Sequence, residues 1–340
     1  MADRRVGAGP PAILSRTPLR VSFAGGGTDL SAYYDKQEGV VLSTAITRYV
    51  HVTVKRHSDL FFEPIRLNYS RSEQVERIDE IENDIARECL KLLGIEPPIY
   101  ISTVGDVPAS TGLGGSSAFA VGLLNALHAY KGERVPAGRL AEEAAHIEID
   151  VLKQPIGKQD QYAAAFGGMN RYTFKSGGGV SAEHQRFSPG VLEELFDSVI
   201  MLWTGHQRDA EGVLAEQKDN TESKRDHLTM MRDQAYELGE VLARPRFDLD
   251  AVGGILDEGW QLKRQLASTI TTGEIDVWYD KAKAAGARGG KLCGAGGGGF
   301  LLFLVEPAQR SAVRDALSDL VEMEVQHESH GSQVMQPFAT

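Results

Sequence analysis

The sequence V-P-A-S-T-G-L-G-G-S-S-A-F-A-V-G-L-L-N-A-L-H-A-Y, residues 107–130, decides the fold because it puts a glycine-rich loop directly before a helix. Residues 99–104 before the loop alternate β-branched and aromatic side chains, which is typical of a strand. Apolar residues from Phe119 to Leu127 recur at helical spacing. The stretch therefore predicts a strand, a tight loop and a helix in direct succession.

The loop has the residue types of a phosphate-binding loop. Gly112, Gly114 and Gly115 allow sharp turns and close approach of the backbone to a ligand. Ser116 and Ser117 suit a helix N-terminus, where free N–H groups and the helix dipole favour an anion. A plain strand-to-helix turn with a serine cap is the alternative. No G-x-x-x-x-G-K-[ST] sequence occurs, so a nucleoside triphosphate would need a cradle of another kind.

The composition describes an ordinary globular chain of 340 residues, 42% hydrophobic and 24% charged. A net charge of −11 argues against broad binding to nucleic acid or to anionic membranes. Cys89 and Cys293 lie far apart, which fits a reducing compartment and gives no metal-ligand spacing. The sequence has no apolar run of membrane-spanning length and no signal-peptide pattern. We expect a soluble cytoplasmic protein with a flexible tail over residues 1–12.

The rest of the chain alternates strand and helix patterns. Strands are predicted over 40–55, 61–69, 169–174, 180–187, 198–204, 300–305 and 321–326. Helices are predicted over 78–93, 136–151, 210–243, 249–266, 275–285 and 307–320.

A second glycine segment, R-T-P-L-R-V-S-F-A-G-G-G-T-D-L at residues 16–30, ends a strand pattern with the polar pair Thr28 and Asp29. Clusters of Gly and Asp also mark simple hairpin turns. The functional interpretation is a loop that brings Asp29 and its backbone onto a polyol, with Arg20 near the end of the strand.

Both glycine segments resemble motifs of the GHMP kinases. P-x-x-x-G-L-G-x-S-S at residues 108–117 is similar to the second motif of that family. R-V-S-F-A-G-G-G-T-D-L at residues 20–30 resembles the first motif of its sugar kinases, which contacts the sugar. The Gly-Gly-Gly-Thr-Asp version, followed by Tyr33 and Tyr34, most resembles the heptose-7-phosphate kinases and their fucokinase relatives.

Two further segments extend the resemblance. G-K-Q-D-Q at residues 157–161 resembles the galactokinase segment that carries the catalytic aspartate, although Asp160 could simply cap a helix. In that family an acid twelve residues upstream binds magnesium, which here gives Glu148. G-x-K-x-C-G-A-G-G-G-G-F at residues 289–300 resembles the third motif. Its formal match to a dinucleotide fingerprint is rejected because an apolar strand follows instead of a helix.

The resemblance implies an α+β fold of two lobes, with an N-terminal mixed α/β lobe over 13–190 and a C-terminal ferredoxin-like lobe over 191–340. It implies an ATP-dependent sugar kinase that uses Mg²⁺ and acts on a small-molecule sugar phosphate. Asp160 would be the base, and Arg20 would steady Asp160 or the migrating phosphoryl group.

The resemblance also assigns binding residues. The implied ATP-binding residues are Pro108, Gly112, Leu113, Gly114, Gly115, Ser116 and Ser117. The implied substrate-binding residues are Gly26, Gly27, Thr28, Asp29, Lys158, Gln159, Gly296 and Gly297. Ser116 and Glu148 would hold magnesium. Gly115 stands where the family usually has the first serine of G-L-G-S-S-A, so Ser117 is the alternative metal ligand.

The expected acceptor is D-glycero-D-manno-heptose 7-phosphate, phosphorylated at the anomeric C1 hydroxyl for nucleotide-activated heptose and capsule or lipopolysaccharide synthesis. Another sugar such as fucose or galactose, and a non-catalytic sugar/ATP sensor, are the alternatives. A phosphorylated acceptor requires a cationic pocket, and the candidates are Arg16, Arg48, Lys158, Arg171 and Lys175. No nucleic-acid or membrane partner is expected, and homo-oligomerisation is left open.

Overall fold

The computed structural model describes residues 12–207 and 210–335, and its larger sheet has eight strands. They run in the order β12-β1-β2-β5-β3-β4, with β6 attached to β2 and β7 to β6. The strands are β1 (Ile13–Ala24), β2 (Gly39–Arg56), β3 (Ile65–Asn68), β4 (Ser72–Val75), β5 (Ile99–Gly105), β6 (Met169–Phe174), β7 (Val180–His184) and β12 (Gln333–Met335). β3 and β5 pair in parallel, and the other pairs of this sheet are antiparallel.

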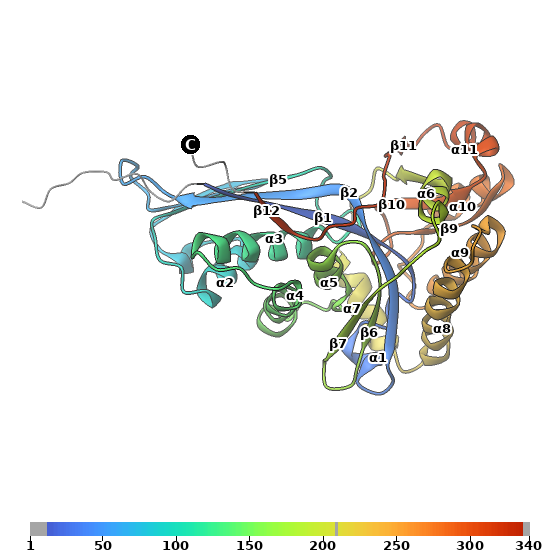
Figure 1. Cartoon of the computed structure of the whole chain (residues 1–340), viewed down its shortest axis with the longest axis horizontal. Coiled ribbons are helices and arrows are strands. Elements are labelled where there is room, and N and C mark those ends of the chain that lie inside the picture. The colour runs from blue at the N-terminus through green and yellow to red at the C-terminus, as the bar shows by residue number, and fades with distance from the viewer. Residues whose placement is uncertain (1–11, 208–209, 336–340) are drawn as a thin grey trace, which may run out of the picture.

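Helices cover one face of this sheet (Figure 1). They are α2 (Asp84–Leu92), α3 (Gly115–Tyr130), α4 (Ala137–Ala145) and α5 (Gln159–Phe166). The interior helix α3 is apolar on nearly all sides and largely buried, as expected for a helix surrounded by sheet and other helices. α3 packs so closely on the sheet that a side chain at Gly122 would overlap the hydroxyl of Thr17.

The second sheet has four strands in the order β11-β8-β10-β9, all antiparallel. They are β8 (Val199–Trp203), β9 (Ala287–Leu292), β10 (Phe300–Val305) and β11 (Val321–Glu322). The lobe also contains α6 (Val191–Ser198), α7 (Ala210–Asn220), α8 (Arg225–Leu242), α9 (Leu249–Lys263), α10 (Gly273–Ala284) and α11 (Arg310–Ala316). Helices join β8 to β9 and β10 to β11, so the lobe has the ferredoxin-like β-α-β-β-α-β arrangement that was expected.

Several predicted elements have different bounds in the structure. The helix predicted over 78–93 starts at Asp84, because the side chain of Asn83 accepts the N–H of Ala86 and caps it there. The helix predicted over 210–243 is two helices, α7 and α8. The helix predicted over 136–151 changes after Ala145 into a π-helical turn, His146–Val151. α6, β4, β12 and the short α1 (Ser31–Tyr34) were not predicted from the sequence.

The end of the described chain returns to the larger sheet, where β12 pairs with β1 and His327 bridges to Ile46. The division at residue 190 stays a prediction. Apart from Ala12, the predicted tail over residues 1–12 lies outside the described residues. Within the described ranges, no helix has both the length and the apolar character needed to span a membrane.

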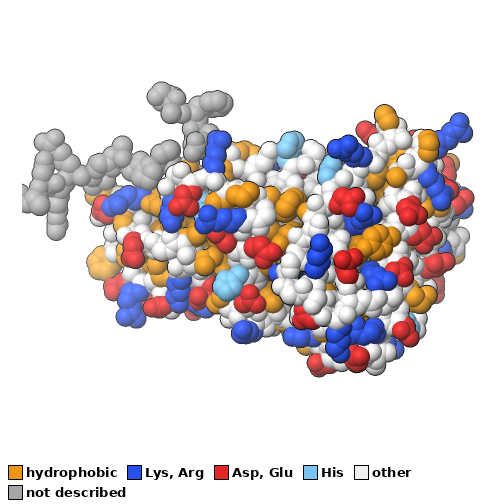
Figure 2. Space-filling model, turned by 60° about the horizontal axis from the view of Figure 1, so that its bottom comes forward, with side chains coloured by type: hydrophobic (Ala, Val, Ile, Leu, Met, Phe, Trp, Pro, Cys, Tyr) orange, Lys and Arg blue, Asp and Glu red, His pale blue; other side chains and the backbone are white. Residues whose placement is uncertain are grey.

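Charges of both signs are interspersed over the face of the molecule drawn in Figure 2. Lys and Arg side chains there alternate with Asp and Glu side chains and form no continuous basic patch. The chain as a whole carries a net charge of −11.

Candidate active site

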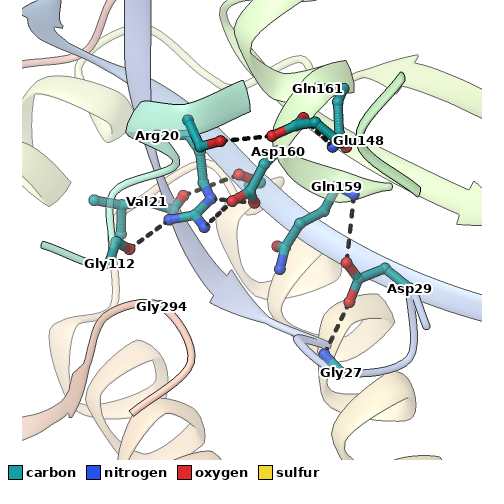
Figure 3. A network of polar contacts seen from close by, with 12 residues as sticks. Arg20, Val21, Gly27, Asp29, Gly112, Glu148, Gln159, Asp160, Gln161 and Gly294 are labelled. Atoms are coloured by element: carbon teal, nitrogen blue, oxygen red, sulfur yellow. Dashed lines mark hydrogen bonds and ion pairs between the residues drawn. The ribbon is translucent and has the colours of Figure 1, made fainter. Parts of the chain in front are cut away.

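A cavity lies where the two lobes meet, and it is lined by loops from both. The first lobe contributes the end of β1 with the loop after it, the glycine loop before α3, and the start of α5. The second lobe contributes α7, α8, α9 and the glycine loop between β9 and β10. Figure 3 shows the polar network on the first-lobe side of this cavity.

Arg20 and Asp160 form a bidentate ion pair at the centre of the network (Figure 3). Arg20 Nε donates to Asp160 Oδ1 at 2.6 Å, and Arg20 Nη2 donates to Asp160 Oδ2 at 2.5 Å. The third nitrogen, Nη1, donates to the carbonyl of Gly112 at 2.7 Å. Arg20 is buried, whereas the Asp160 side chain keeps 23% of its surface exposed. Its carboxylate is therefore held in one orientation while it stays accessible from the cavity.

Glu148 is fully buried in the π-helical turn, and its hydrogen-bond donors among the described residues are neutral. Ser116 Oγ donates to Glu148 Oε1 at 2.7 Å, and Gln161 Nε2 donates to Oε2 at 2.7 Å. Burial raises the pKa of the Glu148 carboxyl, although these hydrogen bonds oppose the shift. His146 and Asp150 are exposed and pair with each other, so Glu148 is the polar side chain of the turn that points inward, next to the buried Ile147. A π turn inside a helix is often found at a functional site.

Asp29 is a second buried carboxylate on the cavity wall. Its Oδ1 accepts the N–H of Gly27 at 3.0 Å, and its Oδ2 accepts the N–H of Gln159 at 3.3 Å. Burial raises the pKa of Asp29 to about 6, and the nearby charge of Asp160 adds to the shift, whereas the two backbone N–H groups oppose it. Gly157 packs directly on this carboxylate, since a Cβ there would overlap it. Asp29 thus ties the first glycine segment to the start of α5.

The two other glycine loops pack against each other across the lobes. A Cβ on Gly112 would lie 2.5 Å from the carbonyl oxygen of Cys293, and a Cβ on Gly294 would overlap the Cα of Gly112. Gly299 approaches Thr111 equally closely. Several glycines of the third motif are therefore required for close backbone contact with the loop that precedes α3.

Comparison with known proteins identifies the family. The GHMP kinases N terminal domain matches residues 76–168, and the GHMP kinases C terminal domain matches residues 240–322. A D-glycero-alpha-D-manno-heptose 7-phosphate kinase from Campylobacter jejuni is 31% identical over 90% of this chain and 93% of that protein. The chain belongs to the GHMP kinase family.

Two further relatives are also sugar kinases. A galactokinase from Pyrococcus furiosus is 26% identical over 90% of this chain and 92% of its own length. The crystal structure of a D-glycero-D-manno-heptose 1-phosphate kinase from Bacteroides thetaiotaomicron has a TM-score of 0.79 and 26% identity, covering 96% of this chain and 100% of that one. This GHMP kinase is a sugar kinase that transfers phosphoryl groups to a hydroxyl acceptor, with ATP as the donor.

The structure brings most of the predicted site residues of this kinase to one cavity. Those that line it are Arg20, Gly26, Gly27, Asp29, Gly112, Gly114, Gly115, Ser116, Ser117, Glu148, Gln159 and Asp160. Gly114 lies directly against the Arg20–Asp160 pair, because a Cβ there would stand 3.3 Å from Asp160 Oδ2. Sequence segments up to 140 residues apart thus converge on one centre.

The remaining predicted site residues do not line the cavity. Thr28 is buried, and its hydroxyl donates to the carbonyls of Gly25 and Val40, so it holds the loop together. Lys158 Nζ donates to the carbonyl of Gly178 at 2.7 Å, in the turn between β6 and β7.

Pro108, Leu113, Gly296 and Gly297 are also absent from the lining. Leu113 is a core residue. Gly296 packs against Ile270, and the N–H of Gly297 donates to the Ile270 carbonyl at 2.7 Å.

The cationic candidates of the sequence analysis also lie outside this lining, and their contacts lie elsewhere. Arg16 contacts Gln333 and Glu328, and Arg171 pairs with Glu183. Two lysines that do line the cavity were not predicted from the sequence, Lys263 at the end of α9 and Lys291 in β9. Gln217, Gln234 and Trp260 were not predicted either. Of these residues, Lys291 had a signal in the sequence, since it is the lysine of the third motif. Trp260 and Lys263 had none, because α9 has the pattern of an ordinary amphipathic helix.

Proposed function

We propose that this kinase transfers the γ-phosphoryl group of ATP to the anomeric C1 hydroxyl of D-glycero-D-manno-heptose 7-phosphate and yields the 1,7-bisphosphate. The observation that carries the proposal is the Arg20–Asp160 pair, which faces a cavity shared with Asp29 and the glycine loop before α3. The identity with the Campylobacter jejuni heptose 7-phosphate kinase supports the choice of acceptor. The product would supply nucleotide-activated heptose for surface polysaccharides.

In this proposal Asp160 orients the acceptor hydroxyl and accepts its proton, and Arg20 fixes the Asp160 carboxylate. Phosphoryl transfer depends mainly on positioning and charge stabilisation, so a small, rigid set of groups is sufficient. Arg20 has a second task, because its contact with the Gly112 carbonyl joins the base to the glycine loop. Arg20 would therefore align the acceptor hydroxyl at Asp160 with the phosphate group on the glycine loop.

The triphosphate would rest on the backbone N–H groups of residues 112–117 at the N-terminus of α3, where the helix dipole favours an anion. The acceptor would lie across the cavity against Asp29, Gln159 and the backbone of Gly26 and Gly27. ATP and magnesium would thus bind the lobe over residues 13–190, and the second lobe would close the acceptor side.

Glu148 and Ser116 fit a magnesium ion. Glu148 is a buried carboxylate that makes no ion pair with a described residue, so a cation would relieve its burial cost. Within the described ranges no cluster of three or more His, Cys, Asp or Glu side chains forms a metal cage. That suits Mg²⁺, which usually binds one or two carboxylates together with water and phosphate oxygens. When bound, it neutralises charge on the phosphate oxygens. Ser116 is proposed as the second ligand because its Oγ lies 2.7 Å from Glu148 Oε1, and Ser117 stays the alternative.

Two alternatives remain. Another sugar such as galactose or fucose is favoured by the galactokinase and fucokinase relatives. A non-catalytic sugar/ATP sensor is disfavoured, because Asp160, Glu148 and Arg20 are present and line one cavity. The buried free cysteines Cys89 and Cys293 are compatible with the proposed cytoplasmic site of action.

The test is ADP release from ATP and Mg²⁺ with a panel of acceptors: heptose 7-phosphate, heptose 1-phosphate, free heptose, fucose, galactose and mevalonate. We expect strong turnover with heptose 7-phosphate, and a new anomeric phosphate in the ³¹P NMR spectrum of the product. Turnover with an unphosphorylated sugar alone would overturn the acceptor and keep the kinase mechanism. ATP binding without turnover of any acceptor would favour the sensor.

A further inference from the structure

Two lysines stand on the second-lobe side of the cavity, and the proposed chemistry uses neither. Lys263 ends α9 and Lys291 lies in β9, and each exposes only 8% of its surface. Lys291 Nζ donates to the carbonyl of Ser22 at 2.7 Å. Lys263 Nζ donates to the carbonyls of Leu292, at 3.3 Å, and Gly294. Both ammonium groups therefore have fixed positions.

Neither lysine has a carboxylate within ion-pair distance among the described residues, in contrast to the paired Arg20. Burial lowers the pKa of Lys263 to about 7, and the charge of Lys291 adds to that shift. Burial also lowers the pKa of Lys291 to about 8. Burial therefore disfavours the charged forms of both lysines, no carboxylate of the described residues pairs with them to offset that cost, and a bound anionic ligand would stabilise the ammonium groups.

The unused hydrogen-bond donors have the same implication. An ammonium group has three N–H donors, of which Lys263 uses two on carbonyls and Lys291 uses one. Three donors remain in a cavity that both side chains line. A phosphate monoester, with two negative charges and three terminal oxygens, matches this set.

Neighbouring side chains associate the lysines with the acceptor. Asp29, proposed to bind the sugar, lines the same cavity as both lysines. Trp260 lies one helical turn before Lys263 and lines the same cavity, and its buried indole N–H has no acceptor among the described residues. A sugar hydroxyl would supply one. By contrast, the groups proposed to bind the triphosphate and its magnesium all lie in the first lobe. They are the backbone amides of residues 112–117, Ser116 and Glu148.

We propose that Lys263 and Lys291 bind the phosphate group that the acceptor sugar already carries, and so make this kinase selective for a sugar phosphate. The inference rests on the proposed function, because it names the part of the protein that would recognise the 7-phosphate. The ammonium groups contribute no step of the transfer. They determine which acceptor is bound with its reactive hydroxyl at Asp160.

The test compares acceptors within each variant. We would measure kcat/KM for heptose 7-phosphate and for free heptose in the wild type and in Lys263→Met, Lys291→Met and Lys281→Met. Methionine is close to lysine in length and removes the charge. Lys281 is an exposed lysine of α10 and serves as the control for loss of one charge. The ratio of the two kcat/KM values does not depend on the fraction of folded enzyme, so poor folding of a variant would not imitate the effect.

We expect each buried-lysine variant to lower the preference for heptose 7-phosphate over heptose by about 30-fold or more, from the loss of charged hydrogen bonds. Lys281→Met should leave it unchanged. An unchanged preference in Lys263→Met and Lys291→Met, with a wild type that turns over heptose 7-phosphate, would overturn the inference and keep the proposed function. An equal loss with both acceptors would also overturn it, because the lysines would then serve the transferred phosphoryl group.

The proposed function can fail separately. If the wild type prefers a different sugar phosphate and the two variants lose that preference, the lysine site stands and the heptose assignment falls. If the wild type uses only unphosphorylated sugars, both fall.

Discussion

Arg20 holds Asp160 through two parallel N–H donors, with Nε on Oδ1 at 2.6 Å and Nη2 on Oδ2 at 2.5 Å. Such a bidentate pair fixes the plane of the carboxylate as well as its position. The residues lie on β1 and α5, 140 positions apart, so the fold itself sets the geometry of the proposed base.

Asp160→Asn should lower turnover by about 100-fold or more, because the amide cannot take up the proton of the sugar hydroxyl. ATP affinity should change little, since Asp160 contacts Arg20 and not the glycine-loop amides. Steady-state ADP release and calorimetric titration with ATP measure the two quantities. Asp280→Asn, at an exposed position of α10, is the matched control. Wild-type turnover in Asp160→Asn would remove Asp160 from the mechanism.

Arg20→Lys should lose about 10- to 100-fold in kcat although it keeps the positive charge, because an ammonium group cannot reproduce the planar fork on Asp160. It should also raise KM for ATP, since the Nη1 contact with the Gly112 carbonyl is lost. Measuring kcat and KM for ATP separates the two effects. A variant with full kcat would show that charge alone is sufficient at this position.

Glu148→Gln should raise the Mg²⁺ concentration needed for half-maximal rate by about 10-fold or more, since a charged ligand becomes a neutral amide of the same shape. The folded protein should not lose stability, because burial raises the pKa of Glu148 and the amide removes that buried charge. A Mg²⁺ titration of the rate and a thermal melt test both points. Glu96→Gln, at an exposed position, is the control. Unchanged Mg²⁺ dependence would exclude Glu148 as a ligand.

The pKa of Asp29, raised to about 6, predicts a pH dependence. As the pH falls through about 6, the carboxylate is protonated and accepts sugar hydroxyls less well, so kcat/KM for the sugar should fall. The effect on stability has the opposite sign. Between the usual carboxyl pKa and about 6, folded Asp29 keeps a proton that the unfolded chain has lost. The contribution of this group to stability therefore falls as the pH rises through that range. Asp29→Asn should remove the step near pH 6 from the rate profile. A step that persists in this variant belongs to another group.

The local parts of the site were predictable from the sequence. The glycine loop before α3 is visible in the local residues, whereas Asp160 and Glu148 were singled out by the resemblance to the GHMP kinases; the structure gathers all three at one cavity. Side-chain direction in loops was harder to predict. Thr28 follows the same three glycines as Asp29, yet backbone carbonyls capture its hydroxyl and turn it inward.

Long-range packing explains what the sequence could not indicate. Lys263 and Lys291 reach the cavity only because the second lobe docks on the first. Nothing local separates Lys263 from a surface lysine, and Lys291 is marked only by its place in the third motif. β12 was missed because a three-residue edge strand acquires its partner, β1, from the opposite end of the chain. The π-helical turn that buries Glu148 likewise has no clear signature in its residues.

The packing of Gly294 on Gly112 predicts that Gly294→Ala is costly. Gly294 has φ +72°, and its Cβ would overlap the Gly112 backbone, so either loop must shift. We expect a loss of about 1–3 kcal/mol in unfolding free energy and a higher KM for ATP, because Gly112 belongs to the proposed phosphate loop. Gly254→Ala in α9 is the matched control, since a Cβ there meets nothing within 4 Å. It should be neutral or stabilise the helix slightly. Equal thermal stability and ATP affinity in the two variants would mean that the loops can separate without cost, and that the third motif does not support the ATP site.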